Sequence, residues 1–129
     1  MVWRLVSNGE VVSNCLKRPS REFSHEMLSV DQVAAISSRI VSAHPDKEFI
    51  FTVSPIRHMG EGAHINTISK STLQLGLQAV TGLASYFPAY EIMLDELRDY
   101  RWYAADLVHP SAAAADYIWE RFREATSLR

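Results

Sequence analysis

The hydrophobic pattern of the first 28 residues predicts a β-hairpin followed by a loop. Two β-prone runs occupy positions 2–7 and 10–13, on either side of Asn8-Gly9. This dipeptide is a strong hairpin signal because both of its residues tolerate a positive φ. Residues 14–26 are polar and include Pro19, so we interpret them as a loop.

A first amphipathic helix is predicted to begin near Ser29. The segment Ser29-Val30-Asp31-Gln32 has the form of a capping box, in which the serine hydroxyl accepts from a backbone N–H and Gln32 reaches back to the cap. His44-Pro45 ends the helix, because a residue before proline disfavours the helical conformation. The expected apolar face repeats at helical spacing and consists of Val33, Ile36, Ile40 and Val41.

The middle of the chain predicts a strand, a loop and a second helix. Residues 49–53 form a continuous apolar run, typical of a strand that is covered on both faces, and Ser54-Pro55 ends it. We interpret residues 56–68 as a loop and residues 69–86 as a helix that stops before Pro88. The predicted buried stripe of this helix is Leu73, Leu77, Val80, Ala84 and Phe87.

The last third of the chain predicts another strand and a final helix. Residues 90–94 are the second strand candidate, and Pro110 suits the first position of the last helix. The apolar face expected for that helix is Ala115, Ile118, Trp119, Phe122 and Ala125.

Helices and strands that alternate in this order predict βαβ units, a parallel sheet and therefore an α/β fold. Only two strands have the character of buried strands, and a two-stranded parallel core is too thin for a stable α/β domain. We therefore expect one partial domain over residues 1–129, with a hairpin and loop at 1–28 and an α/β core at 29–129. Either the fold continues upstream, or two copies complete each other.

Composition and charge narrow the classes of partner. The chain has 129 residues, 47% of them hydrophobic and 22% charged, which is ordinary for one globular domain. Its net charge of −2 gives no electrostatic reason to expect a nucleic acid or an anionic membrane. The sequence shows no secretory signal and no long apolar run, so we expect a cytoplasmic protein. The single cysteine, Cys15, excludes an internal disulfide and a cysteine zinc site, and we expect no cofactor.

Asp106 and His109 are the strongest candidates for chemistry. They lie three residues apart, after the second strand and ahead of the last helix, where ligands of open α/β sheets bind. Histidine suits a general base near neutral pH, and a carboxylate on the far ring nitrogen fixes the tautomer and stabilises the imidazolium. The alternative is that both residues are ordinary helix-capping residues.

Three other side chains could serve as a nucleophile, and each of them also has a purely structural interpretation. Ser54 follows a strand directly, but a Ser-Pro pair more often ends a strand, and no Gly-x-Ser-x-Gly motif surrounds it. We expect Ser69 to be the N-cap of the second helix. Cys15 could pair with an imidazole, but it lies alone in a polar loop.

Several residues could bind a metal or a substrate. His58 and His64 would suit zinc if they converged with His109, whereas solvated loop histidines are the expected case. Arg57 could clamp an anionic group bidentately or be a surface charge. An aromatic set could line a sugar or acyl site or cover the core, and it consists of Tyr100, Trp102 and Tyr103.

Several segments, taken together, resemble one protein family. They are 51–58 (FTVSPIRH), 66–73 (NTISKSTL), 86–92 (YFPAYEI), 97–106 (LRDYRWYAAD) and 109–111 (HPS). In this order they resemble the C-terminal part of the GSCFA domain, a bacterial family of the SGNH hydrolase (GDSL-like) superfamily. Stretches between residues 2 and 23 also resemble the family, so the resemblance covers nearly the whole chain.

The resemblance implies a flavodoxin-like three-layer α/β/α fold, of which this chain would be the C-terminal half with an added hairpin. It also implies a Ser-His-Asp ester hydrolase in which His109 is the base and Asp106 its orienting partner. For an acyl ester or carbohydrate ester substrate, the predicted binding residues are Arg57, Ser54 and Asn66.

The chain departs from the family in the part that supplies the nucleophile. No Gly-Ser-Cys-Phe-Ala motif occurs in its 129 residues, so we expect little or no esterase activity from this chain alone. The alternative is a non-catalytic α/β module that forms a homo-oligomer through an exposed sheet edge.

Overall fold

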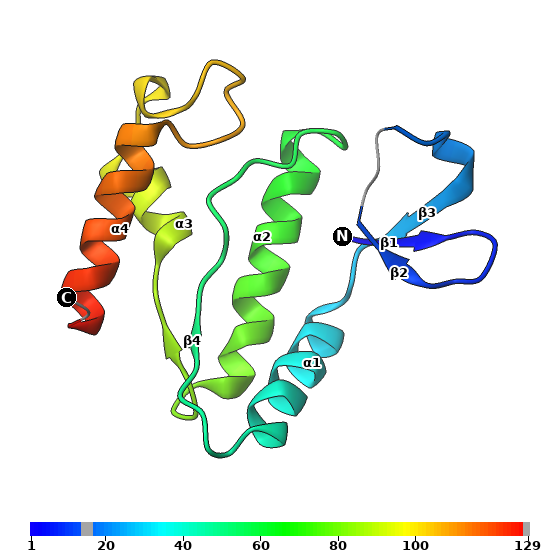
Figure 1. Cartoon of the computed structure of the whole chain (residues 1–129), viewed down its shortest axis with the longest axis horizontal. Coiled ribbons are helices and arrows are strands. Elements are labelled where there is room, and N and C mark those ends of the chain that lie inside the picture. The colour runs from blue at the N-terminus through cyan, green and yellow to red at the C-terminus, as the bar shows by residue number, and fades with distance from the viewer. Residues whose placement is uncertain (14–16, 128–129) are drawn as a thin grey trace.

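The computed structural model describes residues 1–13 and 17–127 as a small antiparallel sheet followed by an α/β unit (Figure 1). The antiparallel sheet has the strand order β2–β1–β3, and the second sheet consists of β4 and β5. Single turns of 3₁₀ helix occur between the main elements, at η1 (Ser20–Glu22), η2 (Gln78–Val80) and η4 (Tyr100–Trp102).

The predicted hairpin is confirmed. β1 (Val2–Leu5) pairs antiparallel with β2 (Val11–Val12). The turn is wider than two residues, because the N–H of Gly9 donates to the carbonyl of Leu5 at 2.8 Å. Gly9 takes a φ of 73°, the left-handed conformation that the Asn-Gly signal requires of at least one residue.

The loop predicted over residues 14–26 is wrong at its end. β3 (Phe23–Glu26) pairs with β1 along its whole length, although three of its four side chains are exposed. An edge strand needs only its backbone for this pairing, so a polar sequence can form it. The ring of His25 stacks on Trp3 at 4.5 Å. Cys15 lies outside the described residues.

The first helix begins as predicted. α1 (Val30–Ala43) has a complete capping box, in which the N–H of Gln32 donates to the Ser29 hydroxyl at 3.1 Å and the Ser29 N–H donates to Gln32 Oε1 at 2.8 Å. Its predicted apolar face is partly wrong, because Ile36 and Ile40 are 38% and 40% exposed. The buried side chains of the helix are Val33 and Ser37.

Val33 lies where the first helix approaches the next one most closely. α1 packs against α2 (Ala63–Leu77), where Gly76 is buried. A Cβ atom at Gly76 would lie 2.5 Å from Cβ of Val33, so the two backbones approach closely only because position 76 has no side chain. Val33 is buried at this contact, whereas Ile36 and Ile40, on the same side of the helix at helical spacing, stay partly exposed.

A parallel βαβ arrangement is present, but its second strand is not the predicted one. β4 (Ile50–Phe51) and β5 (Ser85–Tyr86) pair in parallel, with α2 between them in the chain. α2 begins at residue 63 rather than 69, so Ser69 lies inside the helix and is not its N-cap; Gly62 holds that position. The predicted helix over 69–86 is also wrong after η2, because its last residues form β5.

The strand predicted over residues 90–94 is wrong. These residues belong to α3 (Ala89–Glu91) and to a π-helical turn, η3 (Ile92–Glu96). The helical form brings the neighbours Ile92 and Met93 into the core together, whereas a strand would direct them to opposite faces. They belong to a cluster formed by Phe87, Ala89, Ile92, Met93, Leu97 and Ala114.

The final helix begins two residues later than predicted. α4 (Ala112–Thr126) is capped by Ser111, whose hydroxyl accepts from the N–H of Ala114 at 3.2 Å. Ile118 and Phe122 pack against the core as predicted, but Trp119 is 54% exposed. The ring of Phe122 meets Phe87 edge-on at 5.0 Å.

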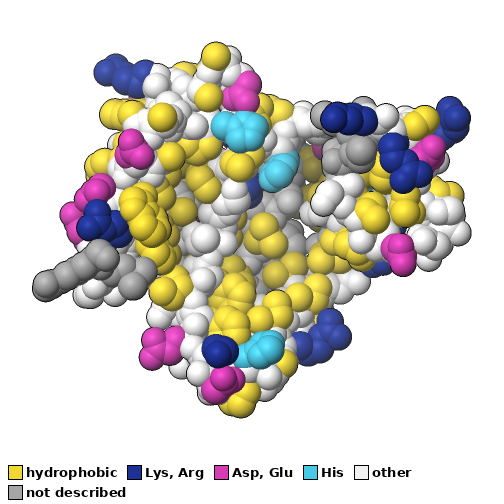
Figure 2. Space-filling view, in the orientation of Figure 1, with side chains coloured by type: hydrophobic (Ala, Val, Ile, Leu, Met, Phe, Trp, Pro, Cys, Tyr) yellow, Lys and Arg dark blue, Asp and Glu magenta, His cyan; other side chains and the backbone are white. Residues whose placement is uncertain are grey.

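The helices lie on two sides of the short parallel sheet. Across Figure 1 the order runs from α4 and α3 through β5 and β4 to α2 and α1. Hydrophobic side chains gather along the hollow between these two sides, on the face drawn in Figure 2. None of the helices within the described ranges combines the length and apolar character that crossing a membrane requires.

Candidate active site

Asp106 and His109 lie on a closed loop between η4 and α4. Tyr103 forms an antiparallel bridge with Pro110, and the N–H of Ala104 donates to the carbonyl of His109 at 2.8 Å. Because the two ends of the loop are held together, the residues between them form a compact turn at the surface.

The Asp106 carboxylate stabilises this turn by hydrogen bonds to residues of the turn itself. Its Oδ1 accepts from the backbone N–H groups of Val108 at 2.9 Å and His109 at 3.0 Å. Its Oδ2 lies 2.6 Å from Nδ1 of the His109 ring. These backbone N–H groups, followed by the imidazole, lower the pKa of Asp106 to about 2, so the carboxylate is ionised at neutral pH.

The alternative that Asp106 caps the last helix is wrong, because its contacts lie within its own turn. Asp106 caps its own turn through Oδ1 and contacts the imidazole through Oδ2. It does not cap α4, because Ser111 does so.

More than half of the His109 side chain is exposed. A carboxylate beside Nδ1 favours the neutral tautomer with the proton on Nδ1, which leaves the lone pair on Nε2. The side chains of His109 and Asp106 are 58% and 49% exposed. The pair can thus accept a proton at Nε2 from any hydroxyl group that reaches it.

Arg57, from a distant part of the chain, also stabilises this turn. Its Nη1 donates to the carbonyl of Leu107 at 2.8 Å, and its backbone N–H donates to the carbonyl of Val108 at 3.0 Å. The guanidinium lies 5.8 Å from the ring of Tyr100 and 5.6 Å from that of Tyr103. Leu107 has a φ of 56°, a left-handed conformation that costs a residue with a side chain about 1–2 kcal/mol.

The structure does not bring Ser54 or Asn66 to the pair by any described hydrogen bond. The Ser54 hydroxyl accepts from the N–H of Ile56 at 3.2 Å, and Oδ1 of the buried Asn66 accepts from the N–H of His58 at 2.8 Å. Their roles in substrate binding stay predictions.

A pocket of about 320 Å³ lies beside the turn that carries the pair. Arg57 and Asn66 both line it, whereas neither Asp106 nor His109 does. Trp102 packs against the core without lining the pocket, whereas Tyr103 does both. The aromatic side chains of the pocket wall are Tyr90, Tyr100 and Tyr103.

Sequence analysis missed Lys70, which is 2% exposed. Its ammonium donates to the carbonyl of Ser54 at 2.6 Å and lies 5.8 Å from the ring of Tyr90. Burial lowers the pKa of Lys70, and burial together with the Lys70 charge lowers the pKa of His58. A signal was present, since Asn66, Lys70 and Gln74 recur every four residues and so share one face of α2.

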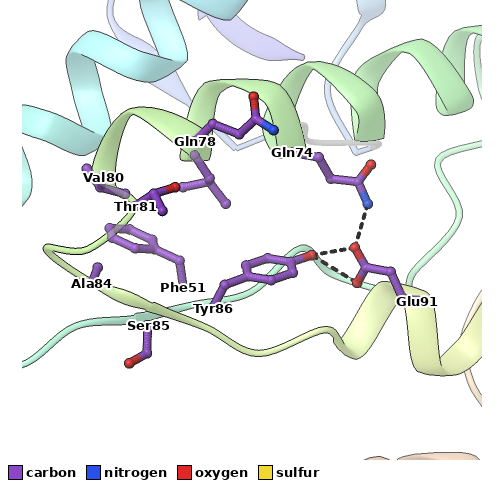
Figure 3. Close-up of a pocket in the computed structure, with 10 residues that line it drawn as sticks. Phe51, Gln74, Gln78, Val80, Thr81, Ala84, Ser85, Tyr86 and Glu91 are labelled. Atoms are coloured by element: carbon purple, nitrogen blue, oxygen red, sulfur yellow. Dashed lines mark hydrogen bonds between the residues drawn. The ribbon is translucent and has the colours of Figure 1, made fainter.

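A second pocket, of about 370 Å³, lies between α2 and the parallel strands (Figure 3). In it the hydroxyl of Tyr86 donates to both oxygens of Glu91, at 2.8 and 2.9 Å, and Nε2 of Gln74 donates to Glu91 Oε1 at 2.8 Å. Burial and the neighbouring carboxylate raise the pKa of Tyr86. This group ties α2 to α3, and the sequence analysis did not single it out.

The zinc alternative lacks a donor set in the described part of the chain. Within residues 1–13 and 17–127, no three His, Cys, Asp or Glu side chains converge as metal ligands would. His64 lies in the first turn of α2, and His58 lies in the preceding loop.

Comparison with known proteins places this site in a family. The model of the GSCFA family matches residues 1–122, from the hairpin into the last helix. The chain belongs to the GSCFA family. The matched range contains Arg57, Asp106 and His109, so every residue that forms the turn lies within it. No curated protein and no solved structure matches the chain.

Proposed function

We propose that this GSCFA chain supplies the acid–base half of a serine ester hydrolase site of the SGNH type. The single observation that carries the proposal is the contact of 2.6 Å between Asp106 Oδ2 and His109 Nδ1. We also propose that the chain is the C-terminal half of a flavodoxin-like fold. This is supported by the parallel strands β4 and β5, which lie between helices on both sides.

The chemistry follows from the two ring nitrogens. His109 Nε2 accepts the proton of a serine hydroxyl while the serine oxygen attacks the acyl carbonyl. Asp106 stabilises the imidazolium, which then gives the proton to the departing alcohol. Water, deprotonated by the same nitrogen, releases the acid and restores the serine.

The substrate proposed is an acyl ester, carbohydrate esters included. The pocket beside the turn supports this class, because Arg57 and Asn66 offer polar groups among aromatic side chains. We propose Ser54 as a binding residue because it follows β4 closely in the chain.

The nucleophile is proposed to come from outside these 129 residues, because the sequence contains no Gly-Ser-Cys-Phe-Ala motif. Incubation of the protein with p-nitrophenyl acetate should give the same slow turnover for the wild type and for His109→Ala. A fluorophosphonate, which labels activated serines, should leave the chain unmodified. Rapid turnover together with labelling at Ser54 would contradict the proposed origin of the nucleophile.

The role of His109 is tested in a fusion protein. In it, the segment of a GSCFA relative that carries the Gly-Ser-Cys-Phe-Ala motif is placed before Met1. Asp106→Asn should lower kcat on p-nitrophenyl acetate by about 10⁴-fold, since the wrong tautomer then faces the serine. His109→Ala should lower it at least as much. Full activity in His109→Ala would show that this imidazole is not the base.

The second candidate is a homo-oligomer that forms through the sheet edge. The N–H groups of Ser85 and Phe87 donate to the carbonyls of Phe49 and Phe51, so the intervening residues of β4 direct their backbone groups to the other side. In the described chain, β4 has a strand partner on one side only. A second copy could extend the sheet across that open edge.

A further inference from the structure

We propose that Arg57 is a positioning residue that holds Asp106 and His109 in their working geometry. This inference rests on the proposed function, since it assigns Arg57 a part in the same site. It gives the guanidinium a role on the protein's own backbone, beyond its predicted contact with substrate.

Arg57 contacts two successive peptide units of the turn. Its Nη1 donates to the carbonyl of Leu107, which belongs to the same peptide unit as the N–H of Val108. Its backbone N–H donates to the carbonyl of Val108, which shares a peptide unit with the N–H of His109. Those two N–H groups are the donors to Asp106 Oδ1.

Arg57 and Asp106 therefore grip the same two planar peptide units from opposite sides. Loss of the guanidinium releases the Leu107 carbonyl, so the peptide unit that carries the Val108 N–H can rotate away from Oδ1, while the backbone N–H of residue 57 still holds the next unit. The carboxylate would then lose one of its two backbone donors and, with it, part of its orientation toward Nδ1.

The guanidinium is itself well placed for this task. It lies against the rings of Tyr100 and Tyr103, at 5.8 and 5.6 Å, and these two rings also contact each other at 5.7 Å. No ion pair within 4.0 Å joins Arg57 to a carboxylate in the described residues, so backbone carbonyls and aromatic rings are its observed partners. A planar, multivalent donor suits them better than an ammonium does.

The test reads the tautomer of His109 by long-range ¹H–¹⁵N NMR above the pH at which imidazole is protonated. We expect the wild type to carry its proton on Nδ1, whereas free imidazole side chains favour Nε2. Arg57→Met should shift the population toward Nε2 by at least threefold. The matched control is Arg39→Met, which removes an exposed arginine of α1 and should leave the tautomer unchanged.

A rescue separates positioning from general loosening of the fold. Leu107→Asn places a residue that tolerates the left-handed conformation at φ 56°, so Arg57→Met/Leu107→Asn should recover most of the Nδ1–H form. If Arg57→Met fails to fold, Tyr100→Leu, which removes one supporting ring, should give a smaller shift in the same direction.

The outcomes distinguish this inference from the proposed function. A wild-type Nδ1–H tautomer that is lost in Asp106→Asn but kept in Arg57→Met and Tyr100→Leu would support the pair and overturn the role of Arg57. A wild type with its proton on Nε2 would contradict the pair itself, and with it the positioning role.

Discussion

At the scale of single residues, Asp106 links its own turn to the orientation of the His109 ring. One carboxylate oxygen accepts from two backbone N–H groups, and the other faces the imidazole. Two charge-assisted backbone hydrogen bonds fix the carboxylate more firmly than the ring alone could. The same contacts that lower its pKa therefore also aim it at His109.

Asp106→Asn should reduce the stability of the protein in a way that depends on pH. The folded-state pKa is about 2, below the ordinary 3.8, so the ionised carboxylate stabilises the fold at every pH above about 4. That contribution should disappear as the pH falls from 4 toward 2. Urea unfolding of both proteins at several pH values measures it, and a difference that stays constant down to pH 2 would contradict the account.

Lys70→Met tests the buried lysine through the stability of the protein at alkaline pH. Burial keeps the folded-state pKa below the ordinary 10.5, so the unfolded chain binds more protons at this side chain between the two values. As the pH rises toward 10.5, the wild type should gain stability relative to Lys70→Met. Lys47→Met, at an exposed lysine, is the matched control and should show no such trend.

Local residue relationships were predictable from the sequence, and distant ones were not. The pair at positions 106 and 109 needs only a turn, so its spacing identified it. The contact of Arg57 with Leu107 spans 50 positions and depends on how the βαβ unit brings two loops together. Lys70 was missed because a lysine without a nearby carboxylate usually lies in solvent.

At the scale of elements, the sequence predicted those whose signals are local. The capping box placed the start of α1, and Asn-Gly placed the hairpin. The start of α2 was missed because Gly62 caps it without a side chain. Residues 90–94 were mistaken for a strand because a short apolar run suits either structure, and only packing against α4 decides for the helical form.

Gly76→Ala should weaken the contact between α1 and α2. Alanine favours a helix intrinsically, but its Cβ would lie 2.5 Å from that of Val33, and the crowding should outweigh the gain. We expect a loss of about 1–3 kcal/mol in the free energy of unfolding. Gly60→Ala is the control, since its Cβ would meet nothing within 4 Å, and it should change stability by less than about 1 kcal/mol. Equal effects of the two substitutions would contradict the close approach.

At the scale of the whole molecule, the parallel sheet is thinner than α/β domains require. Two strands cannot cover the inner faces of helices on both sides, and apolar side chains remain at the surface. The sequence predicted two strands buried on both faces, but the second of them, at 90–94, is helical, and β5 takes its place with both side chains exposed.

Ile50→Lys tests whether copies of the chain meet at the open edge of β4. Ile50 is 45% exposed, and a charge there should oppose pairing of two β4 strands. Light scattering coupled to size exclusion should show a dimer for the wild type and a monomer for this variant. Val11→Lys, at the exposed edge strand of the other sheet, should remain a dimer. A wild type that stays monomeric at high concentration would contradict the oligomer.

The account depends on a proton held between Asp106 and His109, and NMR of the ring nitrogens tests it most directly. Neutral His109 should carry its proton on Nδ1 in the wild type, because the carboxylate lies 2.6 Å away. Asp106→Asn should move that proton largely to Nε2. The same tautomer in both proteins, or a wild type already protonated on Nε2, would contradict the assignment of His109 as an oriented base.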